Sequence, residues 1–257
     1  VQLTAVGNHD SFWKVGGTDQ TASVQLENSV RMLETLGVAN THTDKKVIGG
    51  YTFLIMPWAI GKTGFIGWTE YESLISEACA ENPGKPVFLL EHEPPQDTIY
   101  NSHDWGSSKK RTILDRYPQI IELSGHVHGS LRNDQYIWQG AFSILNGGCL
   151  TTWNGLLNGA SASDPKPAYE VLTVDVFDDR LVAHRWNIHD KTEINPENPW
   201  TIPLPFAAMT APYNREELVA NEVPAAFPAA AEVSVSSDDA NVTVSFPETS
   251  GNVMTYL

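Results

Sequence analysis

The sequence predicts a layered α/β domain of the α+β kind, and three observations lead to this fold class. Strand-like and helix-like segments alternate through the first half of the chain. In the second half, strand-like segments follow one another across short turns. Clusters of Asn, His and Asp stand directly after three of the expected strands, which is where ligand sites of layered sheets are built.

Apolar and turn residues define the elements of the first half in order. Residues 1–6 read as the end of a strand. Apolar side chains at helical spacing predict a helix over 23–36, closed by Gly37. A β-rich run over 46–56 ends at Pro57, and a capping-box pattern beginning at Thr69 predicts a helix that lasts to about residue 81.

The middle of the chain predicts two strands joined through a helix. The continuous apolar run over 87–90 is typical of a strand buried on both faces. A helix is expected over 108–116, before Pro118, and a strand over 120–123 follows it. Further on, 135–145 reads as one strand, and 168–177 is expected to pair with 181–188 in a hairpin.

Composition divides the chain into three parts and excludes some partners. We expect a main domain over 1–194, a Pro- and Ala-rich linker over 195–231, and the start of a β-sandwich-like domain over 232–257. The net charge of −15 argues against a nucleic-acid backbone or an anionic membrane surface as partner. No apolar run is long enough for a transmembrane segment, and Cys79 and Cys149 are expected to be small buried hydrophobes.

Three polar clusters offer nitrogen and oxygen ligands for metal ions. They are Asn8-His9-Asp10, His92, and the pair His126 and His128. In an extended segment residues i and i+2 face the same way, so His126 and His128 would point together with Cα atoms about 6.6 Å apart. That spacing suits two ions about 3.5–4 Å apart better than one, although the pair by itself is equally compatible with a structural hydrogen-bonding feature.

Taken in order, these motifs resemble the later signature motifs of the calcineurin-like metallophosphoesterases, over roughly residues 1–190. The resemblance implies two mixed sheets in a β-sandwich flanked by helices. It also implies that Asn8, His92 and His126 bind one metal ion and that His128 binds the other. His9 would contact the phosphate and protonate the leaving oxygen, and Asp10 would orient His9.

The implied activity is metal-dependent hydrolysis of phosphoric esters, either monoesters or diesters. Two ions would activate a water that attacks phosphorus in line with the leaving oxygen. Ligands without thiolates suit Mn, Fe or Zn. The partner would be a small phosphorylated substrate, held by a protein whose own charge is negative because the ions supply the positive field.

The first two motifs of that family, which supply further Asp and His ligands, would lie upstream of Gly7. The chain begins with Val and not with Met, so we expect that an upstream segment is needed to complete the site. The chain as written is expected to bind at most one metal ion well and to be weakly active or inactive. Acidity, few lysines, and many Thr, Asn and Trp residues favour a secreted, periplasmic or cell-surface location.

Substrate contacts are expected from the polar, aromatic segment 100–105, with Tyr100 and His103 as candidates. Trp58 and Trp153 could stack on a leaving group, although a packing role in the core is the favoured interpretation for both. Two other interpretations stay open. One is a non-catalytic extracellular binding or scaffold module with a phosphoesterase-like fold. The other is a single-metal hydrolase built on Asn8, His92 and His126.

Overall fold

A computed structural model describes residues 2–11, 21–38, 43–61, 65–150, 169–204, 213, 226–238 and 240–247. Contacts divide the chain into two units, Val1–Arg215 and Glu216–Leu257, and each is treated separately below. Within the described ranges, no helix combines the length and the apolar character needed to cross a membrane.

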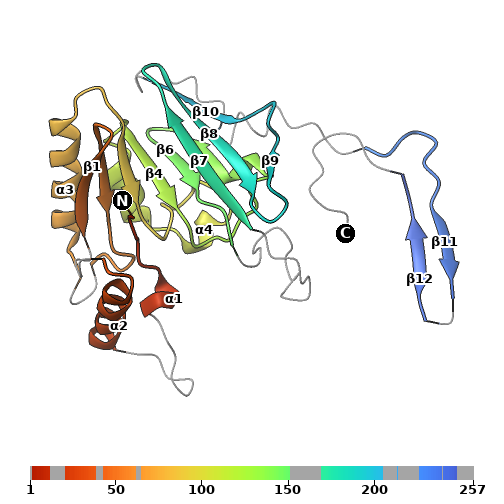
Figure 1. Ribbon diagram of the computed structural model, residues 1–257, viewed down its shortest axis with the longest axis horizontal. Helices are drawn as coiled ribbons and strands as arrows, with labels where there is room; N and C mark the ends of the chain where they lie inside the picture. Colours follow the sequence, from red (N-terminus) through yellow and green to blue (C-terminus); the bar gives the residue numbers. More distant parts are fainter. Residues whose placement is uncertain are drawn as a thin grey trace. The chain divides into compact units, whose positions relative to one another are not determined.

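The first unit is built on a six-stranded mixed sheet with the order β1-β2-β3-β4-β6-β5 (Figure 1). Strands β2, β3, β4 and β6 run parallel, while the edge strands β1 and β5 run antiparallel to their neighbours. The strands are β1 (Asp44–Ile48), β2 (Tyr51–Ile55), β3 (Val87–Leu90), β4 (Ile120–Ser124), β5 (Ile137–Gln139) and β6 (Ser143–Asn146). The carboxyl ends of the parallel strands therefore meet along one edge of the sheet.

A second, antiparallel sheet packs with the first. Its strands are β7 (Glu170–Val176), β8 (Arg180–Asn187), β9 (Thr192–Ile194) and β10 (Trp200–Pro203). Strand β8 pairs with each of the other three. The mixed α/β, α+β class is thus confirmed. Both sheets were expected to contain parallel and antiparallel strands. Within the described residues this holds for the six-stranded sheet, whereas the second sheet is antiparallel throughout.

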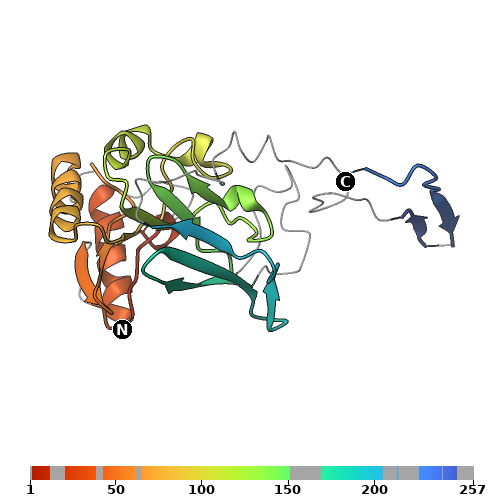
Figure 2. The same ribbon diagram turned by 90° about the horizontal axis from the view of Figure 1, so that it is seen from above.

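Short helices complete the first unit. They are α1 (Asn8–Ser11), α2 (Ala22–Thr35), α3 (Trp68–Glu81), α4 (Ser102–Trp105), α5 (Ser108–Leu114) and the 3-10 turn η1 (Asp134–Tyr136). Figure 2 shows α3 and α5 on one face of the six-stranded sheet and the antiparallel sheet on the other. One apolar core joins these layers, with side chains such as Tyr71, Ile121 and Trp200 buried in it.

Glycines explain several differences from the expected elements. The run over 46–56 is not one strand but the hairpin β1–β2, because Gly49 and Gly50 adopt φ of 60° and 84° and reverse the chain. Helix α3 starts at Trp68 after Gly67 with no side-chain cap, so the capping box expected at Thr69 is wrong. The helices expected over 23–36 and 108–116 are present within two residues at each end, as α2 and α5.

The second half holds one further correction and one confirmed hairpin. The segment 135–145 is not one strand: η1 leads into β5, and β5 turns back on β6. The hairpin of β7 and β8 matches the expectation. Both cysteines are free and buried, as expected.

The boundary between the units lies beyond residue 194. Residues 200–203, assigned from composition to the linker, form β10, in which Trp200 is buried in the core. Most of the remaining linker, including 205–212 and 214–225, lies outside the described residues. In the second unit, β11 (Ser234–Ser237) pairs with β12 (Val242–Ser245) as the alternating pattern predicted.

Candidate metal-binding site

The carboxyl ends of β3 and β4 bring two of the predicted ligands together. Leu90 and Leu123 are partners at the end of the parallel pair, and His92 and His126 follow within three residues. The Gly125 N–H donates to the His92 carbonyl oxygen at 3.0 Å, which ties the two exits from the sheet to each other. Asn8, at the start of α1, joins them from the other end of the sequence.

Three ligand atoms converge at this point. Asn8 Oδ1 lies 2.8 Å from His92 Nε2, and His126 Nδ1 lies 3.0 Å from the same nitrogen. A neutral imidazole nitrogen either donates one proton or offers one lone pair, so with this amide orientation it cannot serve both contacts as a hydrogen bond. His92 Nε2 is thus the atom that both neighbouring side chains contact.

The same spacing agrees with joint binding of a cation. Ligand atoms bound at about 2.1 Å and at right angles to one another lie about 3.0 Å apart, close to the two distances measured here. Among the described residues, no group of three or more His, Cys, Asp or Glu is placed to hold a metal ion. The fit therefore depends on two imidazoles together with the Asn8 amide oxygen.

The electrostatic surroundings keep these imidazoles neutral. Burial, together with the neighbouring His126 and His128, lowers the pKa of His92 to about 3. Burial and the nearby His128 and His9 lower the pKa of His126 to about 4, and burial with His9 lowers the pKa of His128. Neutral rings present the lone pairs that metal binding requires.

The backbone at His126 and His128 differs from the extended conformation expected from the sequence. Strand β4 ends at Ser124, and His126 and His128 have φ of 66° and 48°. The left-handed backbone means that the i and i+2 rule for strands does not apply here, so the expected Cα spacing of the pair is unfounded. Such conformations cost energy and cluster at functional sites.

Gly7 is needed for the His92 ring to occupy its place. A Cβ added at Gly7 would lie 2.7 Å from His92 Cε1 and Nδ1, closer than real contacts allow. At Gly125 the added Cβ would be 3.6 Å from His92 Nδ1, an ordinary contact. The lack of a side chain at Gly7 therefore makes room for the His92 ring.

His9 and Asp10 lie on the turn α1, and both side chains are exposed. His9 is close enough to lower the pKa of His92, His126 and His128, which are half-buried, so it lies beside the cluster. Asp10 Oδ2 accepts the Gly7 N–H at 2.9 Å. No hydrogen bond or ion pair joins Asp10 to His9, both of which are described, so the predicted orienting contact is not formed in this structure.

The two predicted substrate contacts make other interactions. His103 is 72% exposed in its side chain and pairs with Asp97 at 2.7 Å. Tyr100 packs edge-on against Tyr136, with ring centroids 5.9 Å apart. Trp58 is buried among apolar side chains, which supports packing, and Trp153 lies outside the described residues.

Sequence reasoning missed Trp105, which reaches the site from the last position of α4. Its ring centroid lies 4.8 Å from that of His126 with the planes at 67°, and the side chain is 51% exposed. Trp105 belongs to the same aromatic segment as Tyr100. Between the two rings, Asn101 adopts φ of 65° at the N-cap of α4.

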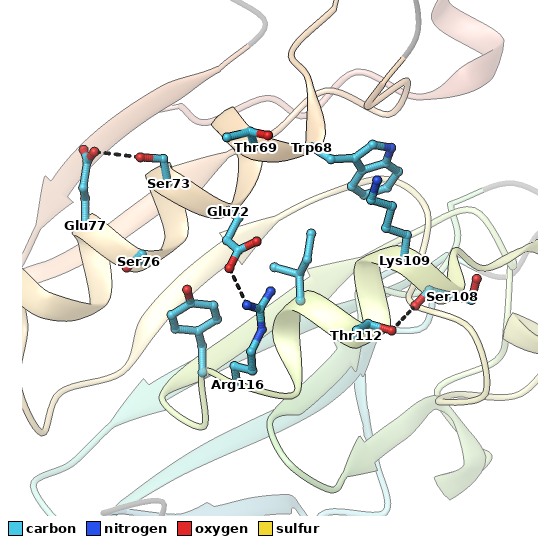
Figure 3. Close-up of a pocket in the computed structure, with 12 residues that line it drawn as sticks. Trp68, Thr69, Glu72, Ser73, Ser76, Glu77, Ser108, Lys109, Thr112 and Arg116 are labelled. Atoms are coloured by element: carbon cyan, nitrogen blue, oxygen red, sulfur yellow. Dashed lines mark hydrogen bonds and ion pairs between the residues drawn. The ribbon is translucent and has the colours of Figure 1, made fainter.

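A separate hollow lies away from these residues. It has a volume of about 790 Å³ and lies between α3 and α5. Figure 3 shows its walls as helix-surface side chains, with Arg116 paired to Glu72 and Lys109 beside Trp68. It contains none of the predicted site residues, so the contacts around His92 Nε2 are the better indication of chemistry.

Comparison with protein-family models finds no match to this chain, and comparison with curated proteins finds none either. The functional assignment therefore depends on the site itself.

Proposed function

We propose that the chain is a metal-dependent hydrolase of phosphoric esters. The observation behind this proposal is the convergence of Asn8 Oδ1, His92 Nε2 and His126 Nδ1 from three segments far apart in the sequence. These are the residues that, by resemblance to the calcineurin-like metallophosphoesterases, would bind one metal ion. His128, whose pKa is lowered beside them, would serve a second ion.

In this proposal some residues bind the metal ion and another transfers a proton. Asn8, His92 and His126 would hold a divalent cation such as Mn, Fe or Zn through neutral lone pairs. When bound, such ions offset the negative charge of a phosphate and lower the pKa of a water molecule. His9, exposed beside the cluster, can reach a substrate and donate a proton to the leaving oxygen. Trp105 and α4 border the site next to His126.

The test is hydrolysis of para-nitrophenyl phosphate and of its bis ester with added Mn²⁺. The His9→Ala variant should lose most of the turnover, about 100-fold or more, and should keep the affinity for Mn²⁺. His103→Ala is the matched control, because that imidazole is exposed and paired with Asp97, and it should leave both properties unchanged.

Because this chain by itself is expected to be weakly active or inactive, turnover is also measured in a form that carries the upstream segment. Metal binding without any turnover in that form would instead favour the binding or scaffold module. Hydrolysis that continues unchanged in His9→Ala would contradict the role of His9 as proton donor. Comparing the monoester with the diester also decides which substrate class the site prefers.

A further inference from the structure

A buried cluster of charged groups lies beneath the candidate site, on the helix side of the six-stranded sheet. Glu91 directly precedes His92 at the end of β3, Lys110 belongs to α5, and Glu122 lies in β4. The side chains of Glu91 and Lys110 are 1% and 3% exposed, and Glu122 is fully buried. Tyr71 of α3 completes the cluster by donating its hydroxyl to Glu91 Oε2 at 3.1 Å.

One ammonium group holds both neighbours of His92. Lys110 Nζ pairs with Glu91 Oε2 at 2.9 Å and also donates to the backbone carbonyl oxygen of Glu93. These two contacts lie on either side of His92 in the sequence. The backbone at this point is thus fixed before and after the residue that places an imidazole in the site.

The surrounding backbone bonds complete the support. The Glu91 N–H donates to the carbonyl oxygen of Leu123 at 3.2 Å, and the His92 carbonyl oxygen accepts from Gly125 at 3.0 Å. Beyond the end of β3, Lys110 donates to the carbonyl oxygen of Glu93. Because Nε2 of His92 contacts Asn8 and His126 at 2.8 and 3.0 Å, a small rotation of this backbone would separate the three ligand atoms.

The neighbouring carboxyl groups keep the Lys110 ammonium group charged. Burial by itself would lower the pKa of Lys110, but attraction to Glu91 and Glu122 outweighs burial and the pKa is raised. Both carboxyl oxygens of Glu122 have no hydrogen-bond partner, and burial followed by repulsion from Glu91 raises its pKa well above the usual range. Lys110 therefore stays charged and directs its hydrogen bonds to Glu91 and Glu93.

A buried ion pair is weak support for stability, since the cost of removing charges from water offsets their attraction. Its specific effect is on geometry. We infer that Lys110 is a positioning residue for metal binding, whose ammonium group clamps Glu91 and Glu93 so that the His92 imidazole faces Asn8 and His126. This inference rests on the proposed metal site and adds a residue that contacts no metal ion itself.

The test measures Co²⁺ and Mn²⁺ binding by the full chain, with Co²⁺ absorption as a report on ligand geometry. Lys110→Met should lower the affinity about 10- to 100-fold and change the Co²⁺ spectrum, as expected for loss of a group that orients a ligand. Lys110→Arg, which keeps a cation with several donors, should restore a large part of the affinity. Lys109→Met, the neighbour whose ammonium lies over Trp68, is the matched control and should bind as the unaltered chain does.

The double variant Lys110→Met/Glu91→Gln is the second test, because replacing Glu91 removes the carboxylate that pairs directly with the lost ammonium group. In a folded double variant, near-ultraviolet circular dichroism should match the unaltered chain while metal affinity falls. Unchanged affinity and an unchanged Co²⁺ spectrum in this variant would overturn the role of Lys110 alone. Absence of Co²⁺ and Mn²⁺ binding by the unaltered chain would overturn the proposed metal site and this inference together.

Discussion

Two histidines on the two sheets of the first unit have opposite surroundings. His184 on β8 lies between carboxylates, with Nδ1 2.6 Å from Glu193 Oε1 and Nε2 3.6 Å from Asp175 Oδ2. His92 at the end of β3 has an amide oxygen and a second imidazole as its nearest partners. The same side chain is therefore part of an ion pair on one sheet and part of a ligand group on the other.

The difference shows what distinguishes a structural histidine from a candidate ligand. At His184 a carboxylate oxygen lies beside each ring nitrogen, that of Glu193 at 2.6 Å and that of Asp175 at 3.6 Å. At His92 the neighbouring histidines and burial disfavour protonation, and the contacts bring acceptors together. The second arrangement is the one on which the proposed metal site rests.

The largest expected effect separates these two histidines directly. His92→Ala should lower Mn²⁺ affinity by more than about 100-fold, because loss of a ligand should exceed the 10- to 100-fold cost of losing an outer partner. Isothermal titration with Mn²⁺ measures it. His184→Ala is the control: its affinity should be unchanged, and stability should fall by about 1 kcal/mol or less because the pair is partly exposed. Equal affinities in the two variants would contradict the comparison.

An intermediate effect is expected from the glycine beneath the His92 ring. Gly7→Ala places a Cβ 2.7 Å from the ring and should displace it, with a stability cost of about 1–3 kcal/mol and a fall in Mn²⁺ affinity of about 10-fold. Gly125→Ala meets the same ring at 3.6 Å and should stay within about twofold of the unaltered affinity. Urea denaturation and metal titration of both variants measure the contrast, which a similar loss in the two would refute.

The smallest expected effect is a pH dependence of stability, and it contrasts Glu122 near the candidate site with Glu193 beside His184. Glu193 is paired with His184, whereas Glu122 is buried without a hydrogen-bond partner, facing Glu91, Lys110 and Tyr71. Since burial and then Glu91 raise the pKa of Glu122, the native state keeps its proton while the unfolded chain loses it near pH 4.3. This contribution to stability is complete below the unfolded pKa and is lost as pH rises toward the folded pKa, by up to about 1.4 kcal/mol per pH unit.

Glu122→Gln removes that titration and keeps the shape of the side chain. The gain in unfolding free energy relative to the unaltered chain should be larger at pH 8 than at pH 5, by about 1 kcal/mol or more. Urea denaturation at the two pH values measures it. Glu77→Gln, on the exposed side of α3, should show no such difference between pH 5 and pH 8. Parallel pH profiles for Glu122→Gln and the unaltered chain would mean that Glu122 ionises normally.

Local patterns predicted the elements whose residues interact with near neighbours in the chain. The helix α2 with Gly37 after it, the buried strand β3, and the β7–β8 hairpin follow from periodicity and turn residues. The hairpins at Gly49-Gly50 and between β5 and β6 were missed, because a short apolar run does not reveal where it reverses. Strand β10 was hidden by its prolines and forms because Trp200 enters the core.

The candidate ligands Asn8, His92 and His126 were identified from their order and their places after expected strands, although residues 2–7 form no strand. The structure brings Asn8 and His126 within hydrogen-bonding distance of His92. The backbone of His126 and the partner of Asp10 were not predictable, since both depend on how the exits from the sheet are tied together. Trp105 lies in the expected contact segment 100–105, but Tyr100 and His103 were chosen from it, and Lys110 stands in no motif.

The sequence by itself determined the α+β class, the two parallel strands that end at the histidines, and the types of ligand available there. Periodicity and residue chemistry are local properties, so they can be read along the chain. Only the tertiary structure decided which aromatic ring meets His126 and which ammonium group holds the residues around His92. Those choices depend on contacts between elements distant in the sequence, where packing and the cost of burying charge select the partners.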